Sequence, residues 1–345
     1  MTATYQKYIL NFKRPSGTSR GILTTKETWF IFINDTERIG IGECGILRGL
    51  SIDDVFDYEA KLNWACENIA LGLDTLLKEL APYPSIQFGL EMAFKSLQAE
   101  STFELFPSAF TKSKAAIPIN GLVWMGSKTF MQQQIQQKLG EGFRCIKLKI
   151  GAIDFETELD LIKSIRDEFT PEDIEIRVDA NGAFSPNDAL EKLKRLSDFN
   201  LHSIEQPIRP QQFHHMADLC ERSPLNIALD EELIGVFSVT EQAHLLQTIQ
   251  PDYIILKPSL IGGYGGSKSW IDLANELDIK WWVTSALESN VGLNAIAQWT
   301  YTLKNELPQG LGTGSLFTNN FSSPLEVKNG YLHYNDLIEW DFNLI

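Results

Sequence analysis

Short apolar runs alternate with amphipathic stretches from residue 117 onward. The runs predict strands, and the stretches between them, such as residues 154–168 and 186–196, predict helices. The strand candidates are residues 116–122, 145–150, 174–179, 201–205, 226–230, 253–257, 280–284 and 308–312. Parallel strands separated by helices in this number are typical of a (β/α) barrel.

An open, doubly wound sheet is the alternative arrangement for this pattern. It is disfavoured because no glycine-rich dinucleotide-binding loop follows an early strand candidate. Residues of functional type also end many successive strands. That arrangement suits a barrel, in which the strand ends converge on one face.

The first third of the chain has a different pattern. Residues 27–34 are rich in β-branched and aromatic side chains, and a polar turn separates them from a second strand candidate at residues 39–44. Residues 52–105 have helical periodicity. The predicted division is an α+β unit at residues 1–115, the barrel at residues 116–315, and a segment at residues 316–345 that returns to the first unit.

Charged residues end four consecutive strand candidates. Asp179, Glu205 and Asp230 end three of them and Lys257 ends the fourth, each about 25 residues after the last, as expected for one βα unit. Because the C-terminal ends of barrel strands meet at one face, these charges should converge there. The spacing therefore predicts a functional site at that face.

Three acids in one half-buried site would repel each other strongly unless a cation neutralised them. All-oxygen ligation, with no Cys or His nearby, favours Mg²⁺, and Mn²⁺ is the second ion that it allows. We predict Asp179, Glu205 and Asp230 as the metal ligands, and prefer Asp230 to the following Glu231 and Glu232 because it comes first at the rim. The alternative is that each acid caps the next helix or pairs with an arginine.

Two lysines share one face of an otherwise apolar strand candidate, because Lys147 and Lys149 are two positions apart. A lysine acts as a general base when burial or a neighbouring cation lowers its pKa. We predict Lys149 as the base, with Lys147 beside it and Lys257 facing the substrate from across the barrel mouth. The expected chemistry is removal of a proton next to a carboxylate. The alternative is a surface strand with solvated lysines.

The loops after the last barrel strands are candidates for substrate binding. Such loops commonly hold anionic groups, so Ser285, Gly312 and Thr313 are predicted to capture a carboxylate. Asn181, just past the first acid, is predicted to order the site, with a plain turn role left open. Arg20, in a polar loop near the N-terminus, is predicted to face an anionic substrate, with a solvated hairpin loop left open.

Composition narrows the class of protein. The chain has 345 residues and a formal net charge of −15, which argues against non-specific binding to nucleic acid. It lacks a signal-peptide core and any apolar run of membrane-spanning length. Its four scattered cysteines favour reduced thiols in a cytoplasmic protein. The expected partner is a small carboxylate substrate, and a homo-oligomer is compatible with the sequence.

The lysine pair, the three acids and Lys257 resemble the pattern of the enolase superfamily, in its muconate-lactonising subgroup. Residues 40–43 are similar to part of that superfamily's capping domain, so the resemblance covers essentially the whole chain. It implies an α/β fold with a modified (β/α)7β TIM-type barrel and an α+β capping domain built from both chain ends. It also implies Mg²⁺-dependent chemistry through an enediolate.

Three activities share this arrangement of lysines: o-succinylbenzoate synthesis, dipeptide epimerisation and N-acylamino acid racemisation. Residues 117–122 and 310–317 look like the synthase family, and residues 312–314 lack the Asp-x-Asp motif of most epimerases. The resemblance implies syn dehydration of 2-succinyl-6-hydroxy-2,4-cyclohexadiene-1-carboxylate in menaquinone synthesis. Lys149 would move the protons and Lys257 would stabilise the enediolate. A racemase or epimerase, and a non-catalytic metal-stabilised protein, are the alternatives.

Overall fold

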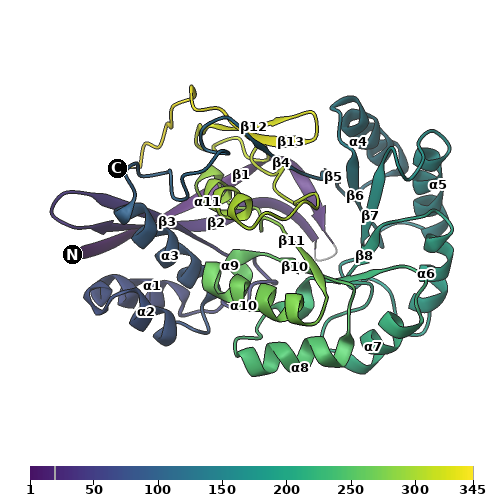
Figure 1. Ribbon diagram of the computed structural model, residues 1–345, viewed down its shortest axis with the longest axis horizontal. Coiled ribbons are helices and arrows are strands. Elements are labelled where there is room, and N and C mark those ends of the chain that lie inside the picture. Colours follow the sequence, from purple (N-terminus) through teal and green to yellow (C-terminus); the bar gives the residue numbers. More distant parts are fainter. Residues whose placement is uncertain (19–20, 345) are drawn as a thin grey trace.

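Three sheets organise the part of the chain that the computed structural model describes, residues 1–18 and 21–344 (Figure 1). Two are antiparallel with three strands each, and the third is a parallel sheet of seven strands. Within the described residues, no helix has the length and apolar character needed to cross a membrane. The predicted cytoplasmic location and the exclusion of nucleic acid stay predictions.

The N-terminal unit is a hairpin-based sheet covered by helices. Its elements are β1 (Thr2–Thr18), β2 (Gly21–Asn34), β3 (Ile39–Gly45), α1 (Tyr58–Glu67), the 3₁₀ turn η1 (Ile69–Leu71), α2 (Leu73–Glu79) and α3 (Pro84–Gln98). Strand β3 lies directly against α3, since a Cβ atom added to Gly42 would be 1.9 Å from the carbonyl oxygen of Gly89. Two glycines therefore bring backbone against backbone at this contact.

The parallel sheet forms the barrel wall. Its strands, in both chain and spatial order, are β5 (Gly121–Val123), β6 (Cys145–Lys149), β7 (Glu175–Asp179), β8 (Ser203–Glu205), β9 (Ile227–Leu229), β10 (Tyr253–Leu256) and β11 (Lys280–Val283). The helical elements between and after them are α4 (Lys128–Gly140), α5 (Phe155–Arg166), α6 (Ala189–Ser197), α7 (Phe213–Arg222), η2 (Glu231–Leu233), α8 (Val239–Ile249), α9 (Pro258–Ile261), α10 (Gly263–Glu276) and α11 (Asn290–Thr302). Figure 1 shows α4 to α8 around the outside of the barrel, and α9 to α11 toward the N-terminal unit.

Local sequence accounts for these elements. In β6, Ile146 and Leu148 are fully buried on the outward side of the strand, and the alternate positions carry the lysines. Helix α5 begins where the Asp154 side chain accepts a hydrogen bond from the backbone N–H of Thr157 at 3.2 Å. The helices predicted at residues 154–168 and 186–196 are confirmed as α5 and α6, within three residues at each end.

The first and last strand candidates of the barrel differ from the prediction. Residues 116–122 form two short strands, β4 (Ala116–Pro118) and β5, because Pro118 lacks an N–H and the next residue donates to Gly330 instead. Residues 308–312 form no regular strand. Only Gln309 and Gly310 make isolated parallel bridges, to Ile119 and Thr284, which close the barrel. Pro308 has no N–H group to pair, and Gly310 and Gly312 have no side chains to pack, which disfavours a regular strand here.

The C-terminal segment makes contacts in two directions. Strands β12 (Leu325–Lys328) and β13 (Tyr331–Tyr334) form a hairpin that pairs with β4 beside the barrel. The stretch before it follows β1, where Phe317 bridges to Phe12. The domain boundaries at residues 115 and 315 stay a prediction.

Candidate active site

The register of the barrel strands brings the predicted charged residues together. Lys149 of β6 is paired with Asp179 of β7, which is paired with Glu205 of β8. Glu205 is paired with Ala228 of β9, so Asp230 follows at the same end of the next strand. These residues therefore share one end of the barrel, as the spacing in the sequence predicted.

The side chains at this end form ion pairs. The Nζ atom of Lys147 lies 2.9 Å from Oδ2 of Asp179 and also contacts the carboxylate of Glu205. Lys149 pairs with the same Asp179 oxygen at 2.9 Å. Lys257 contacts Asp230 and lies 4.0 Å from Oε1 of Glu205. Three ammonium groups thus balance three carboxylates in a buried cluster.

Burial and neighbouring charge act against each other in this cluster. Burial opposes ionisation of Asp179, but Lys147 and Lys149 outweigh it and hold the pKa of its carboxyl far below the usual range. Burial also disfavours the ammonium forms of Lys147 and Lys257, yet the adjacent carboxylates raise the pKa of both. The pKa of Glu205 is raised, by burial first and then by the charge of Asp179. Glu205 is therefore the carboxylate that needs a further cation most.

Glu205 is the acid of this cluster whose surroundings best fit a metal ion. Within residues 1–18 and 21–344, no three Asp, Glu, His or Cys side chains converge in a ready ligand group. The lysines pair with the carboxylates instead. Both carboxylate oxygens of Glu205 are buried without a hydrogen bond of acceptable geometry. Two such oxygens, flanked by two further buried carboxylates, fit an oxygen-seeking divalent cation.

Asn181 connects the predicted base to its surroundings. Its Oδ1 atom accepts a hydrogen bond from Nζ of Lys149 at 2.7 Å, and its own Nδ2 donates to Oε1 of Glu231 at 3.0 Å. Its backbone N–H donates to Oδ1 of Asp179, which holds it in a left-handed conformation with a φ of 43°. Asn181 thus contacts both Lys149 and Glu231, and its role in ordering the site stays a prediction.

The two acids after Asp230 have other contacts. Glu232 accepts hydrogen bonds from the Gln206 side chain and from the backbone N–H of Gln211, and Glu231 contacts Asn181. Asp230 is the acid of this run that pairs with Lys257.

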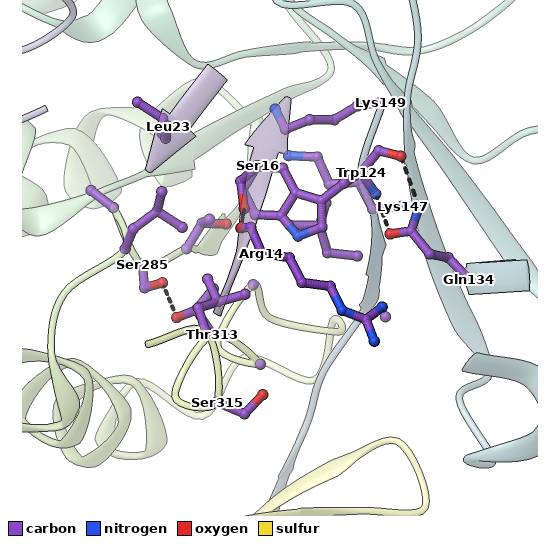
Figure 2. A pocket seen from close by; sticks show the side chains of 18 of the residues that line it. Arg14, Ser16, Leu23, Trp124, Gln134, Lys147, Lys149, Ser285, Thr313 and Ser315 are labelled. Carbon is purple, nitrogen blue, oxygen red and sulfur yellow. Dashed lines mark hydrogen bonds between the residues drawn. The ribbon is translucent and has the colours of Figure 1, made fainter. Parts of the chain in front are cut away.

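A cavity of about 500 Å³ opens above the cluster (Figure 2). The described cationic residues that line it are Lys13, Arg14, Arg48, Lys138, Lys147, Lys149 and Lys257, and no acid is among its described lining residues. This is an unusual balance in a chain of net charge −15. The cavity therefore suits an anionic ligand.

The predicted carboxylate-binding loops lie on one side of the cavity. Ser285 and Thr313 are both buried, and their hydroxyl oxygens are 2.6 Å apart (Figure 2). Gly312 also lines the cavity. Arg20 lies outside the described residues.

Sequence reasoning missed several lining residues. Arg14 lies on β1, which stays paired with β2 as far as Thr18, where the sequence had predicted a polar loop. The run of polar residues around Arg14 in the sequence was the signal that could have found it. Trp124 follows β5 directly and is held by the Gln134 side chain, which bonds its backbone N–H at 2.9 Å and its carbonyl at 3.0 Å. The acids were predicted because residues at the C-terminal ends of barrel strands converge on one face. The same argument, applied to apolar residues, would have predicted Trp124.

The barrel, the N-terminal unit above it and the charged strand ends define a capped (β/α)-barrel enzyme. The family model described as "Enolase C-terminal domain-like" matches residues 131–338. The chain is 48% identical to an o-succinylbenzoate synthase of Desulfotalea psychrophila over 363 aligned residues, which cover 96% of this chain and 98% of the relative. The crystal structure of MenC from the same organism has a TM-score of 0.86 at 44% identity, covering 96% of this chain and 99% of that one.

Two further relatives mark the range of the family. An N-succinylamino acid racemase of Thermus thermophilus is 31% identical and aligns with 64% of this chain and 58% of its own length. A dipeptide epimerase of Enterococcus faecalis, solved with Mg and a dipeptide, has a TM-score of 0.84 at 17% identity, covering 96% of each chain. The chain belongs to the enolase superfamily. The predicted fold class is therefore confirmed.

Proposed function

We propose that this chain is an o-succinylbenzoate synthase, which converts 2-succinyl-6-hydroxy-2,4-cyclohexadiene-1-carboxylate to 2-succinylbenzoate and water, a step in menaquinone synthesis. The observation that carries the proposal is that Lys149 and Lys257 face one cavity whose described lining holds seven cations and no acid. Such a cavity suits a substrate with two carboxylates. The 48% identity to a synthase supports this reaction among those that the site could perform.

Lys149 is proposed to act as the base and then as the acid. As a neutral amine it would donate its two N–H groups to Asp179 and Asn181, which leaves its lone pair free to take the α-proton. The resulting ammonium would return that proton to the departing hydroxyl on the same face. One C–H and one C–O bond break, a C=C bond forms, water leaves, and the ring becomes aromatic.

The other charged residues are proposed to stabilise negative charge. Lys257 directly follows β10, which is three strands beyond the strand of the acid paired with Lys149, so its ammonium would face the substrate from the far side. Asp179, Glu205 and Asp230 would hold Mg²⁺, with Mn²⁺ as the alternative ion. The ion would supply positive charge where negative charge develops on the substrate carboxylate. Lys147 would keep the charge of Asp179 and Glu205 balanced.

The second carboxylate of the substrate needs its own partners. Ser285, Thr313 and the backbone at Gly312 line one wall of the cavity, and Arg14 reaches into it from the N-terminal hairpin. Within the described residues Arg14 has no acid partner, whereas Arg48 is held by Glu27 and Asp54. Lys13, the neighbouring lining residue on β1, likewise has no acid partner among the described residues, so Arg14 and Lys13 are the hairpin cations available for a carboxylate.

Racemisation of an N-succinylamino acid is the second candidate, since that substrate also carries two carboxylates and lysines on two sides could exchange one proton. The 31% identity to an N-succinylamino acid racemase supports this second reaction. Dipeptide epimerisation is disfavoured, because no described lining residue is an acid that could hold an ammonium group.

Turnover of the cyclohexadiene substrate with Mg²⁺, followed by ultraviolet absorbance, tests the proposal. Lys149→Ala should lower kcat by about 10³-fold or more, because the base is lost. Lys128→Ala removes an exposed lysine outside the cavity, which is paired with Asp160, and should keep kcat within about 3-fold. A folded wild-type enzyme that leaves this substrate unchanged, yet exchanges deuterium into N-succinylamino acids, would instead establish the racemase.

A further inference from the structure

The wall of the cavity differs on the two sides of Lys149. On one side lies β7, whose Asp179 accepts a hydrogen bond from Nζ of Lys149 at 2.9 Å. On the other side lies β5, which pairs with β6 in parallel register as far as Val123 and Leu148. Trp124 is the next residue, so in that register it stands opposite Lys149. The lysine therefore lies between an acidic side and a side that ends in an indole ring.

The side chain of Trp124 points into the cavity. Side chains alternate between the two faces of a strand, and Val123 is fully buried on the outward face of β5. Leu122 and Trp124 therefore share the inward face, and both line the cavity. Figure 2 shows the indole ring directed into the cavity and away from the Gln134 side chain. The ring is thus placed to contact a ligand that reaches Lys149.

Gln134 of α4 holds both polar groups of the Trp124 backbone. Its Oε1 atom accepts a hydrogen bond from the backbone N–H at 2.9 Å, and its Nε2 atom donates to the carbonyl oxygen at 3.0 Å. The side-chain amide thus takes the place of a neighbouring strand at the point where β5 ends. Helix α4 begins soon after, at Lys128, and the Ser127 side chain caps it. The backbone of Trp124 is therefore held in place before any ligand binds.

The cavity has an apolar lining in addition to its cations. Part of this lining comes from the segment between the start of β5 and the start of β6, and part from the loop after β3. The apolar residues that these two segments contribute are Leu47, Leu50, Leu122, Trp124, Phe130 and Phe143. Such side chains offer no group for acid–base or metal chemistry, but they suit a flat carbon surface. The cavity is therefore built to take a carbon framework as well as carboxylates.

We propose that the six-membered ring of the substrate packs against Trp124, and that Gln134 is the residue that positions Trp124 for this contact. The inference rests on the proposed function, which gives the substrate its ring. The carbon that loses its proton to Lys149 is itself a ring atom, and its carboxylate would face the acids proposed to hold the metal ion. The rest of the ring then extends to the other side of Lys149, toward Trp124.

This contact makes Trp124 a specificity-determining residue. The α-carbon of most N-succinylamino acids is not part of a ring, so those substrates would leave the indole face largely uncovered. Aromatic rings also attract each other beyond their burial from water, and the substrate ring becomes aromatic as the reaction proceeds. Trp124 therefore favours the dehydration over racemisation at the same two lysines.

Binding of two matched ligands tests the ring contact. The reaction product, 2-succinylbenzoate, and 4-oxoheptanedioate have the same carbon chain between their carboxylates, but only the first has a ring built on it. Calorimetry with Mg²⁺ should show that wild type binds 2-succinylbenzoate about 10-fold more tightly or better, since the ring adds four carbons to be buried. Trp124→Leu should weaken 2-succinylbenzoate by about 10-fold and 4-oxoheptanedioate by less than about 3-fold, because only the ring loses its partner. Trp124→Phe keeps an aromatic face and should recover most of that loss.

Gln134→Met tests the positioning role, even if Trp124→Leu fails to fold. Methionine has nearly the same length as glutamine but leaves both backbone groups of Trp124 without this partner. The variant should weaken 2-succinylbenzoate by about 3- to 10-fold and 4-oxoheptanedioate by less than about 2-fold. In the Trp124→Leu background it should cost less than about 2-fold, since Gln134 acts through Trp124. Gln133→Met is the matched control, because Gln133 is an exposed neighbour on α4 outside the described cavity lining, and it should keep both affinities within about 2-fold.

Turnover of the cyclohexadiene separates this inference from the proposed function, because the binding experiment needs no reaction. If wild type turns over the substrate but Trp124→Leu weakens both ligands equally, or neither, the ring contact is wrong and the synthase assignment stands. If wild type shows no turnover but Trp124→Leu selectively loses 2-succinylbenzoate, only the proposed function fails. Equal binding of the two ligands by wild type would also contradict the ring contact. A full additional loss from Gln134→Met in the Trp124→Leu background would show that Gln134 does not act through Trp124.

Discussion

A single lysine, Lys147, sets the charge balance at the residue scale. It contacts two carboxylates, whereas Lys149 and Lys257 each make their shortest ion pair with one. Lys147 is only 7% exposed, so its ammonium group is a fixed counter-ion within the wall of the barrel. Asp179 and Glu205 are thereby kept close together, and the remaining charge of Glu205 is what a divalent ion would neutralise.

Metal binding can be tested without activity through Glu205. If the three acids hold Mg²⁺, the ion binds only the folded chain and should raise the free energy of unfolding by about 2.7 kcal/mol at about 100 times its Kd. Glu205→Gln should lose most of that increase, and chemical unfolding with and without Mg²⁺ measures it. Glu232→Gln changes a nearby buried acid that bonds Gln206, and should keep the increase. An undiminished Mg²⁺ effect in Glu205→Gln would rule out this ligand.

At the scale of elements, the contact between β3 and α3 sets how the N-terminal unit is built. Gly40, Gly42 and Gly89 all lie at this contact, and a Cβ atom on any of them would meet another atom at 2.1 Å or less. The strand and the helix are therefore as close as their backbones allow. Glu43 lies on this strand directly after Gly42, so the contact also fixes the residue that holds the start of α11.

Gly42→Ala should destabilise the protein by about 2–4 kcal/mol, because the added methyl group would overlap the Gly89 backbone and the two elements would have to separate. Gly140→Ala is the control, since a Cβ atom there, at the end of α4, meets no atom within 4 Å. It should be neutral or stabilising by about 0.5 kcal/mol. Urea unfolding of both variants makes the comparison, and equal stabilities would contradict the close contact.

The strand-end residues could be predicted from the sequence because their placement is local. Side chains alternate between the two faces of a strand, so the strand itself fixes the direction of the Asp179 and Glu205 side chains. Parallel pairing then brings the C-terminal ends of neighbouring strands together. The closure of the barrel at Gln309 and Gly310 was predicted less well. Its two bridges need Ile119 from the start of the barrel and Thr284 from the preceding βα unit, and both lie outside the segment itself. Arg14 and the partners of Glu43 could not be predicted, because those contacts form only when distant segments pack.

At the scale of the whole molecule, the two ends of the barrel have different chemistry. The catalytic end holds balanced charges under an open cavity. The opposite end is filled by the guanidinium group of Arg177, 4.2 Å from the Trp282 ring centroid, and by His202 and Tyr253, whose ring centroids are 4.8 Å apart. This end of the barrel is thus packed with aromatic rings and with Arg177, whose charge is paired with Glu175.

The base of the barrel should make stability sensitive to acid. Burial lowers the pKa of His202 to about 4, and Arg177 and Lys280 add to this against an opposing Glu175. The folded chain therefore binds this proton more weakly than the unfolded chain, and stability falls as the pH drops from about 6.5 toward 4. From pH 7 to pH 5 the loss from this group should be about 2 kcal/mol.

His202→Gln should remove that part of the pH dependence, measured as the change in unfolding free energy between pH 7 and pH 5 relative to wild type. His244→Gln, at an exposed position on α8, should leave it intact. An identical fall in wild type and His202→Gln would show that the buried imidazole is not the cause.

The pairing of β4 with β13 has a consequence for how the chain folds as it is made. β4 comes directly before the first barrel strand, yet its partner strand β13 follows about 200 residues later, which at about 5–20 residues per second takes roughly 10–40 s of synthesis. During that interval the Ala116–Pro118 edge has no strand beside it, and neither Phe12 nor Phe30 has its aromatic partners from the C-terminal segment. A nascent chain of this protein therefore exposes a strand edge and two aromatic rings throughout the synthesis of its barrel.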